Sequence, residues 1–229
     1  MKLQGLAKLT LLDFPGRVAS TVFFGGCNLR CPFCHNAGLV LDPSQYEQID
    51  ETELYRFLEK RKGILDGVAV TGGEPLLQPE LARLLREIRA RGFAVKLDTN
   101  GTLPDKLEPL LDEGLADYVA MDIKNDAAHY AETSGRDVDL DAVRRSIALI
   151  MEKAPDYEFR TTVVSAFHTP DSIRGAAELI RGAKRYFLQN FIDSGALIAP
   201  GLTACSRETL DKMLESAREI IPDTQLRGV

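Results

Sequence analysis

The chain has 229 residues, with 28 Lys and Arg against 34 Asp and Glu, which gives a formal net charge of −6. This acidic balance argues against binding to nucleic acid or to an anionic membrane, because phosphate-tracking surfaces need an excess of basic residues. No stretch approaches the roughly 18 apolar residues of a membrane span and the N-terminus does not resemble a signal peptide, so we expect a cytoplasmic protein.

Six short runs of apolar and β-branched residues alternate along the chain with segments of helical spacing. Such continuous apolar runs are typical of strands that are covered on both faces. The predicted strands span residues 18–24, 67–71, 94–99, 118–124, 158–164 and 185–191. Helix starts between them are indicated by a capping box at Asp50 and Glu53, by Pro79 as a first-turn proline, and by Thr169 followed by Pro170.

These six βα units predict an α/β fold with a parallel sheet and right-handed crossovers. Six units fit a partial (β/α)6 TIM-like barrel better than the complete barrel, which has eight. A flat doubly wound sheet stays open as an alternative, because periodicity does not separate the two architectures. We expect a single domain over 1–229, with an N-terminal extension at 1–17, a barrel core at 18–191 and a C-terminal helical segment at 192–229.

The cysteines are the strongest chemical signal in the sequence. Cys27, Cys31 and Cys34 fall within eight residues, whereas Cys205 is far away, which argues against disulfides and for a metal or cluster site in a reducing compartment. Three thiolates spaced Cys-x3-Cys-x2-Cys can hold three irons of a [4Fe-4S] cluster, which normally takes four cysteines. The fourth iron is then open to a small-molecule ligand.

A structural zinc site is the alternative, with His35 or Cys205 as the fourth ligand. Structural zinc sites usually combine two short Cys-x2-Cys-like motifs, and this sequence lacks the second one. His35 also directly follows Cys34, which forces adjacent residues onto one small ion. The spacing therefore favours the cluster.

This spacing is the signature of the radical S-adenosylmethionine (SAM) superfamily, which the chain resembles. Residues 13–16, Asp-Phe-Pro-Gly, and residues 23–36 look like the opening of the glycyl-radical-enzyme activases. The resemblance is greatest to the activating proteins of anaerobic ribonucleoside-triphosphate reductase, with pyruvate formate-lyase activating enzymes as near relatives. Further matches follow in order at residues 72–74, 98–101, 122–124 and 160–164.

The resemblance implies a role for each of these segments. Cys27, Cys31 and Cys34 hold the cluster, and the side chains or backbone expected to bind SAM are those of Phe33, Gly72, Gly73, Glu74, Asp98, Thr99, Asn100, Asp122, Lys124, Arg160 and Gln189. In some members a monovalent cation also binds beside Asp98, Thr99 and Asp122. The residues proposed to bind a protein partner are Asp13, Pro15, Gly16 and His35.

Elementary geometry supports part of this assignment. Glycines let a backbone approach a ligand closely, and the carboxylate of Glu74 can accept from an ammonium group. Asp122 and Lys124 point to one face of their strand, and Arg160 is expected to project inward. An ordinary βα turn, a structural ion pair and an arginine that reaches out to solvent are the respective alternatives. His168 has either a site-facing or a loop role, and His129 and Cys205 carry no motif.

The implied reaction is reductive cleavage of SAM to methionine and a 5′-deoxyadenosyl radical, which removes a hydrogen atom from a glycine of a partner enzyme. Anaerobic ribonucleotide reductase is the favoured partner, because Gln189 and Asn190 replace a His-bearing stretch of the pyruvate formate-lyase activases. With only Cys205 to spare, a second cluster is excluded, so flavodoxin or ferredoxin is expected as the electron donor. A pyruvate formate-lyase activating enzyme, a radical SAM enzyme with another peptide or small-molecule substrate, and a non-enzymatic zinc or iron-sulfur module are the alternatives.

Overall fold

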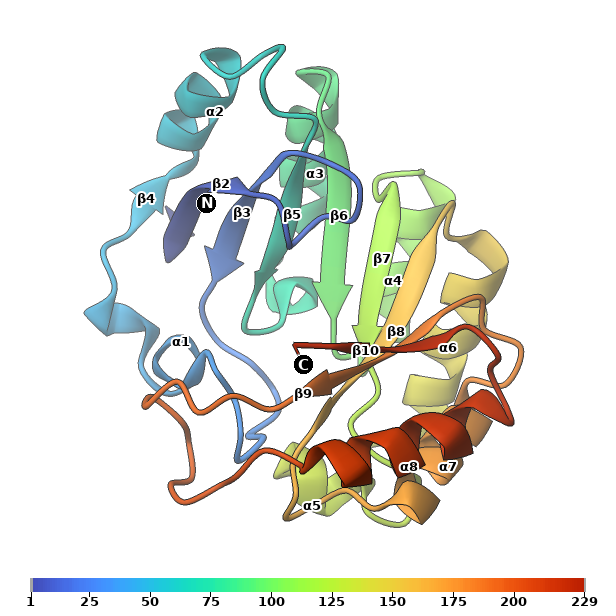
Figure 1. Ribbon diagram of the computed structural model, residues 1–229. Coiled ribbons are helices and arrows are strands. Elements are labelled where there is room, and N and C mark those ends of the chain that lie inside the picture. Colours follow the sequence, from blue (N-terminus) through green and yellow to red (C-terminus); the bar gives the residue numbers. More distant parts are fainter. Residues whose placement is uncertain (1, 229) are drawn as a thin grey trace.

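The main sheet contains the six strands expected from the sequence, all parallel to one another (Figure 1). The computed structural model describes residues 2–228, so Met1 and Val229, the ends of the predicted domain, lie outside it. The strands are β3 (Ala19–Phe24), β5 (Gly67–Gly72), β6 (Ala94–Thr99), β7 (Tyr118–Asp122), β8 (Tyr157–Val163) and β9 (Tyr186–Asn190). The predicted parallel sheet is confirmed, and the strand ends differ from the predicted ones by at most about two residues.

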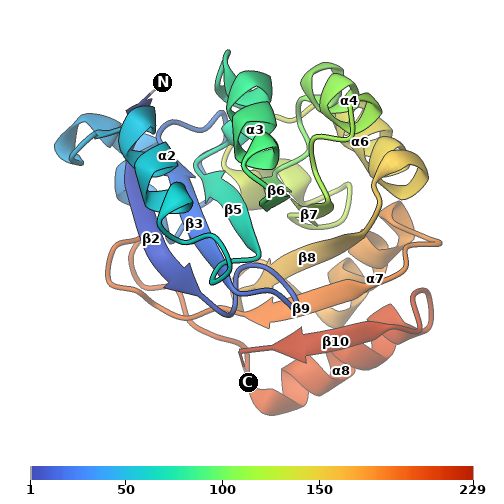
Figure 2. The same ribbon diagram turned by 90° about the horizontal axis from the view of Figure 1, so that it is seen from above.

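The sheet curves around an interior, and helices cover its outer face (Figure 2). These helices are α2 (Glu51–Glu59), α3 (Leu81–Ala90), α4 (Pro104–Asp112), α6 (Leu140–Lys153), α7 (Pro170–Leu179) and α8 (Arg207–Arg218). A doubly wound sheet carries helices on both faces. The flat alternative is therefore wrong, and the partial barrel is confirmed. Within residues 2–228, no helix is both long and apolar enough to cross a bilayer.

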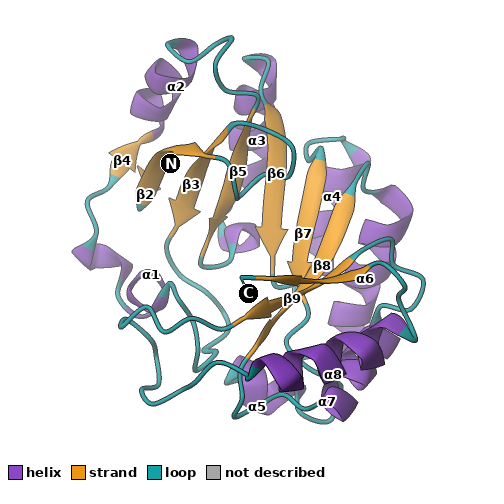
Figure 3. Cartoon of the chain, viewed as in Figure 1, coloured by secondary structure: helices purple, strands orange, loops and turns teal. Residues whose placement is uncertain are grey.

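Short helical elements lie in the connections that follow strands. They are α1 (Ala37–Leu41) and the 3₁₀ turn η1 (Pro43–Gln45) after β3, the 3₁₀ turn η2 (Pro75–Leu77) after β5, and α5 (Tyr130–Ser134) after β7. Figure 3 shows these elements and the surrounding loops on the side of the sheet where the strands end. This side is where parallel α/β folds place their functional residues.

Two further strands extend the sheet, whose order is β10-β9-β8-β7-β6-β5-β3-β2. The N-terminal extension forms β2 (Gly5–Thr10), which pairs antiparallel with β3. The C-terminal segment, expected to be helical, contains α8 and also β10 (Thr224–Arg227), which pairs in parallel with β9. A separate antiparallel pair joins β1 (Lys2–Leu3) to β4 (Ile49–Asp50). The main sheet thus has edges at β2 and β10 and forms an open barrel.

The helix starts agree with the sequence at two of three places. Thr169 begins α7 with a reciprocal capping box, and Asp50 caps α2 by accepting from the backbone N–H of Thr52, one residue earlier than a capping box requires. Pro79, however, lies two residues before Leu81, where α3 begins. The prediction of a first-turn proline is therefore wrong for α3.

Alternate side chains along each strand separate the main core from the barrel interior. Outward-facing residues such as Val22, Val70 and Val119 are fully buried in the main core beneath the helices. Inward-facing residues near the strand starts form a separate apolar cluster, in which Phe14, from the loop between β2 and β3, packs with Ala19, Tyr118 and Ala120. Phe14 therefore fills the amino end of the barrel, and polar side chains occupy the carboxyl end.

Candidate active site

A cavity lies at the carboxyl end of the barrel, between the loop after β3 and the ends of β5 to β9. Of the residues predicted to bind a cluster or SAM, all but Glu74 line it. The lining residues are Cys27, Leu29, Cys31, Phe33, Cys34, His35, Asn36, Val40, Thr71, Gly72, Gly73, Asp98, Thr99, Asn100, Asp122, Lys124, Arg160, Thr162 and Gln189. Segments that are more than 150 residues apart in the sequence thus meet at one site.

The three cysteines present sulfur atoms to this cavity. Cys31 is buried and Cys27 and Cys34 are half-buried. Burial raises the pKa of all three thiols, whereas the positive charge of Lys124 lowers it. The backbone N–H of Leu29 lies 3.4 Å from the Cys27 sulfur. Three soft ligands with a nearby cation and an N–H donor fit an anionic iron-sulfur cluster.

The alternative zinc ligands are held elsewhere. The His35 ring stacks on Phe191 at 5.7 Å, and its Nε2 lies 2.7 Å from the carbonyl oxygen of Ile192. Cys205 is buried in the main core. Among the described residues, no three His, Cys, Asp or Glu side chains gather tightly enough to hold a single metal ion. Within residues 2–228, neither His35 nor Cys205 is therefore placed as the fourth ligand of a structural zinc site, whereas a cluster spreads its cysteines over separate irons.

Gly72 and Gly73 bring the end of β5 directly against the cysteine loop. A Cβ atom on Gly73 would lie 1.8 Å from the carbonyl oxygen of Gly26, and one on Gly72 would lie 2.3 Å from the backbone of Phe24. Backbone hydrogen bonds of 2.8 and 2.9 Å run from Gly73 to Phe24 and from Glu74 to Gly26. The need for glycine at Gly73 therefore comes from this contact between two loops, in addition to any approach of a ligand.

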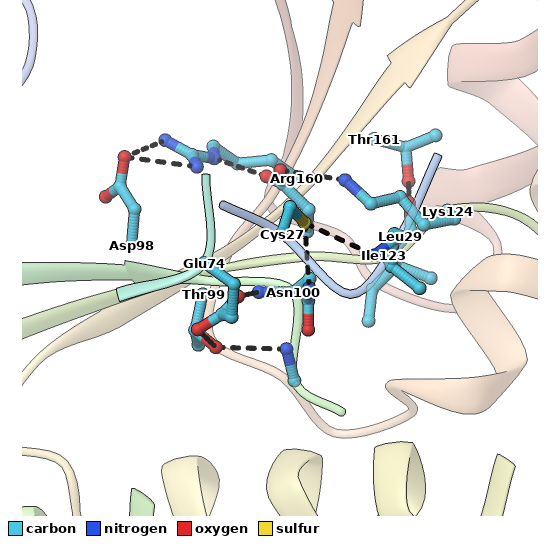
Figure 4. A network of polar contacts seen from close by, with 12 residues as sticks. Cys27, Leu29, Glu74, Asp98, Thr99, Asn100, Ile123, Lys124, Arg160 and Thr161 are labelled. Atoms are coloured by element: carbon cyan, nitrogen blue, oxygen red, sulfur yellow. Dashed lines mark hydrogen bonds and ion pairs between the residues drawn. The ribbon is translucent and has the colours of Figure 1, made fainter. Parts of the chain in front are cut away.

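Glu74 is not among the residues that line the cavity, and Figure 4 shows it beside Thr99 and Asn100. Its fully buried carboxylate accepts hydrogen bonds from the Thr99 hydroxyl at 2.9 Å, the Asn100 N–H at 2.7 Å and the Leu76 N–H at 3.1 Å. Burial raises its pKa to about 7 against the opposing effect of these donors. Three of the protein's own donors thus occupy the Glu74 carboxylate, and its expected contact with SAM stays a prediction.

Asn100 contacts both Glu74 and the cysteine loop. Its side-chain amide donates to the Asn28 side chain at 2.9 Å and lies 3.7 Å from the Cys27 sulfur. Asn36, at the other end of the loop, donates to the carbonyl of Gly72 at 2.8 Å. Asn36, two residues after Cys34, belongs to the stretch that resembles the activases but was not among the predicted site residues.

The polar floor of the cavity is an ion network. Arg160 Nε donates to Asp122 at 2.9 Å, its Nη2 lies 3.4 Å from Asp98, and Lys124 donates to Asp122 at 3.1 Å. Burial alone would raise the pKa of Asp122, but the charges of Arg160 and Lys124 outweigh it and hold this pKa well below its usual range. The inward direction of Arg160 and the shared face of Asp122 and Lys124 are as predicted, and the solvent-facing alternative for Arg160 is wrong.

Lys96 belongs to the same network and was not singled out in the sequence. Its ammonium group is buried and paired with Asp98. The period-two rule that joined Asp122 to Lys124 also places Lys96 and Asp98 on one face of β6. The signal was therefore present in the sequence.

The residues expected beside a monovalent cation do not fit one. Asp98 is paired with Lys96 and Arg160, Asp122 is paired with Arg160 and Lys124, and the Thr99 hydroxyl donates to Glu74. Protein cations thus already neutralise both carboxylates. We therefore assign no monovalent cation to Asp98, Thr99 and Asp122.

Phe33 and Gln189 lie on the wall of the cavity, and His168 lies behind it. The Phe33 ring is edge-on to His168, with ring centres 6.4 Å apart. His168 is buried, accepts from the Val164 N–H at 3.0 Å and lies 2.9 Å from the Lys124 carbonyl. These bonds give His168 a bracing role at the start of the Lys124 loop. His129 lies at the surface, where it pairs with Asp126.

The partner-binding residues predicted in the N-terminal extension are not brought together with His35. The Asp13 carboxylate accepts from the Thr21 hydroxyl at 2.5 Å, within the barrel. Pro15 and Gly16 line a separate depression near the strand starts. Only His35, on the rim of the main cavity, lies beside the cysteines.

Comparison with known proteins identifies the family of this chain. Residues 21–180 match the family model described as the radical SAM superfamily. A Methanocaldococcus jannaschii protein named as a glycyl-radical enzyme activating enzyme is 30% identical over 193 residues, which cover 82% of this chain and 79% of the relative. The pyruvate formate-lyase-activating enzyme of Clostridium pasteurianum is 33% identical over 129 residues, 54% of this chain and 52% of the relative. A 7-carboxy-7-deazaguanine synthase of Methanopyrus kandleri is 37% identical over 143 residues, 54% of each chain.

Solved structures share the architecture at low sequence identity. Streptococcus suis SuiB bound to the precursor peptide SuiA aligns with a TM-score of 0.70 and 16% identity, over 95% of this chain and 50% of SuiB. Methylornithine synthase aligns with a TM-score of 0.66 and 14% identity, over 91% of this chain and 63% of that enzyme. The family match covers more than half of the chain and includes the three-cysteine loop. The chain therefore belongs to the radical SAM superfamily, whose enzymes use a [4Fe-4S] cluster and SAM.

Proposed function

We propose that this protein is an activating enzyme that generates a glycyl radical on a partner enzyme. The observation that carries the proposal is the cavity itself, which joins the three cysteines to the ion network of Asp122, Lys124 and Arg160 at the open end of a barrel. The similarity to the Methanocaldococcus jannaschii protein extends over most of both chains and supports this choice within the superfamily.

The residues of the cavity divide into cluster ligands and SAM contacts. Cys27, Cys31 and Cys34 would hold three irons and leave the fourth open to the methionine part of SAM. Lys124 and Arg160 bring positive charge to the cavity, where a carboxylate of the ligand needs it. When bound, the cluster supplies one electron to the sulfonium of SAM and so provides the radical chemistry.

The walls of the cavity serve to position SAM and to exclude water. Phe33 and Leu29 are apolar and almost fully buried, and they suit contact with the adenine ring. Gly72 and Gly73 offer backbone groups near the cysteines, and Gln189 on β9 offers an amide on the facing wall. These groups bind and orient SAM, and none of them needs to transfer a proton.

Anaerobic ribonucleotide reductase is the partner that we propose, with flavodoxin or ferredoxin as the electron donor. Gln189 and Asn190 support it, because they stand where pyruvate formate-lyase activases carry histidine. A pyruvate formate-lyase is the second candidate, favoured by the relative from Clostridium pasteurianum. His35, on the exposed rim, is proposed to contact either partner.

Anaerobic reconstitution with iron and sulfide, followed by reduction in the presence of SAM, tests the enzyme class. We expect 5′-deoxyadenosine and methionine in equal amounts, and a protein that assembles the cluster but never cleaves SAM would contradict the proposal. Incubation with the ribonucleotide reductase and, separately, with a pyruvate formate-lyase then identifies the partner. A glycyl doublet in the electron paramagnetic resonance spectrum of one of them is the expected result. SAM cleavage without a doublet on either enzyme would favour a different peptide or small-molecule substrate.

A further inference from the structure

Arg227, near the end of β10, points into the barrel interior. β10 runs parallel to β9 with Arg227 beside Gln189, which lines the cavity. Neighbouring residues in such a register share a face of the sheet. The Arg227 guanidinium lies 3.5 Å from the centre of the Phe187 ring, which holds it in a fixed orientation. Arg227 lies outside residues 21–180, the part of the chain that matches the superfamily model.

Arg227 binds Glu158 in a two-pronged contact. Its Nη1 and Nη2 donate to the two carboxylate oxygens of Glu158 at 2.8 and 2.6 Å, and the Tyr118 hydroxyl donates to the same carboxylate at 2.9 Å. Glu158 is only 1% exposed, so water does not replace these donors. Burial alone would raise the pKa of Glu158, but Arg227 and Arg160 outweigh it and lower this pKa. A buried, ionised carboxylate needs such partners.

Arg160 lies within reach of this same carboxylate. One of its terminal nitrogens is 4.0 Å from Glu158, on the same face of β8, whereas its Nε donates to Asp122 at 2.9 Å. Arg160 therefore lies among three carboxylates: Asp122 and Asp98 at the cavity, which it contacts at 2.9 and 3.4 Å, and Glu158 toward the strand starts, at 4.0 Å. As long as another cation forms the ion pair with Glu158, Arg160 stays with the carboxylates at the cavity.

We propose that Arg227 is a positioning residue, which neutralises Glu158 and so keeps Arg160 on Asp122 at the floor of the SAM cavity. Without Arg227, the unpaired charge of Glu158 draws Arg160 across the 4.0 Å gap. Asp122 then pairs with Lys124 alone. Neither Arg160 nor Lys124 is then available to the carboxylate of bound SAM. This inference rests on the proposed roles of Arg160 and Lys124 in binding SAM.

The test measures the dissociation constant of SAM by equilibrium dialysis on the reconstituted protein, for Arg227→Gln, Glu158→Gln and the double variant. We expect Arg227→Gln to weaken SAM binding about tenfold, which is about the cost of losing one hydrogen bond to a charged group. We expect the double variant to return to within about twofold of the parent, because the neutral amide introduced by Glu158→Gln no longer competes for Arg160. Arg207→Gln, in an exposed pair with Asp211 on α8, is the matched control and should bind SAM normally.

Recovery in the double variant distinguishes positioning from a merely structural contribution of β10. Unchanged SAM affinity in Arg227→Gln, or a double variant as weak as the single one, would overturn the inference. If Arg227→Gln does not fold, the double variant is compared with Glu158→Gln, and weaker SAM binding by the double variant overturns the inference. Arg160→Gln distinguishes failure of the positioning role of Arg227 from failure of the proposed function. Normal SAM affinity in that variant contradicts the proposed role of Arg160 itself.

Discussion

The carboxylate of Glu74 accepts a hydrogen bond from the backbone N–H of Asn100 at 2.7 Å and so joins the ends of β5 and β6 behind the cavity. This bond is made inside the protein, where the charge of Glu74 costs solvation free energy. Glu74 accordingly holds a pKa of about 7, above its usual 4.5.

Glu74 should make stability fall as pH rises. With its pKa raised, the folded state binds more protons than the unfolded state between about pH 4.5 and 7, so this group's contribution to stability is largest below this window and is lost across it. We expect the free energy of unfolding of the parent to decrease relative to that of Glu74→Gln over this range. Urea titrations at several pH values measure the difference, and a constant difference from pH 4.5 to 7 would contradict the raised pKa.

The cysteines should separate cleanly into cluster ligands and a core residue. Cys31→Ala removes one of the three sulfur ligands at the cavity and should abolish cluster assembly, whereas Cys205→Ala should retain it because Cys205 lies in the main core. Iron and sulfide content after anaerobic reconstitution, together with the visible absorption spectrum, measures the outcome. Loss of the cluster in Cys205→Ala would instead support a site with four cysteine ligands, Cys205 among them.

A methyl group at Gly73 should displace the cysteine loop. In Gly73→Ala the new Cβ would lie 1.8 Å from the Gly26 carbonyl oxygen, an overlap that backbone must relieve by moving. We expect a loss of about 1–3 kcal/mol in the free energy of unfolding, as for other overpacked sites, and reduced cluster content. Gly5→Ala is the control, because the atoms nearest to its Cβ would belong to the Phe23 side chain, at 3.3 Å or more, and not to backbone. Equal effects of the two substitutions would argue against the contact between the loops.

SAM binding should not depend on the monovalent cation in the buffer. Lys96 and Arg160 already neutralise Asp98, so replacing potassium or sodium by tetramethylammonium at constant ionic strength should leave the dissociation constant of SAM unchanged. Lys96→Met removes one of these charges, and we expect it to introduce a dependence on potassium or sodium. Tighter SAM binding by the parent protein in potassium or sodium than in tetramethylammonium would show that the protein cations do not suffice.

The predictable part of the fold is the part that is buried on both faces. The runs at β5 and β7 are continuously apolar because helices cover one side and the barrel interior the other. β2 and β10 were missed because they are edge strands of mixed polarity, half-buried along much of their length. Their place depends on pairing with β3 and β9, which local sequence does not reveal.

The candidate site likewise has a part that local sequence predicts and a part that it does not. The cysteine spacing is local, and period two along a strand was enough to place Asp122, Lys124 and Arg160 in the interior. The contacts of Glu74 could not be predicted from the sequence, because only the fold brings together its three donors, which come from Leu76, Thr99 and Asn100.

The contact of Gly73 with Gly26 also bears on how the site can move. Two backbones that touch without room for one carbon atom, and that share hydrogen bonds on both sides, move as a rigid body. The segments that carry the cysteines and the end of β5 therefore have no hinge between them. We therefore expect any conformational change that admits or releases a ligand to take place in other walls of the cavity, while the cysteine loop and the end of β5 keep their relative positions.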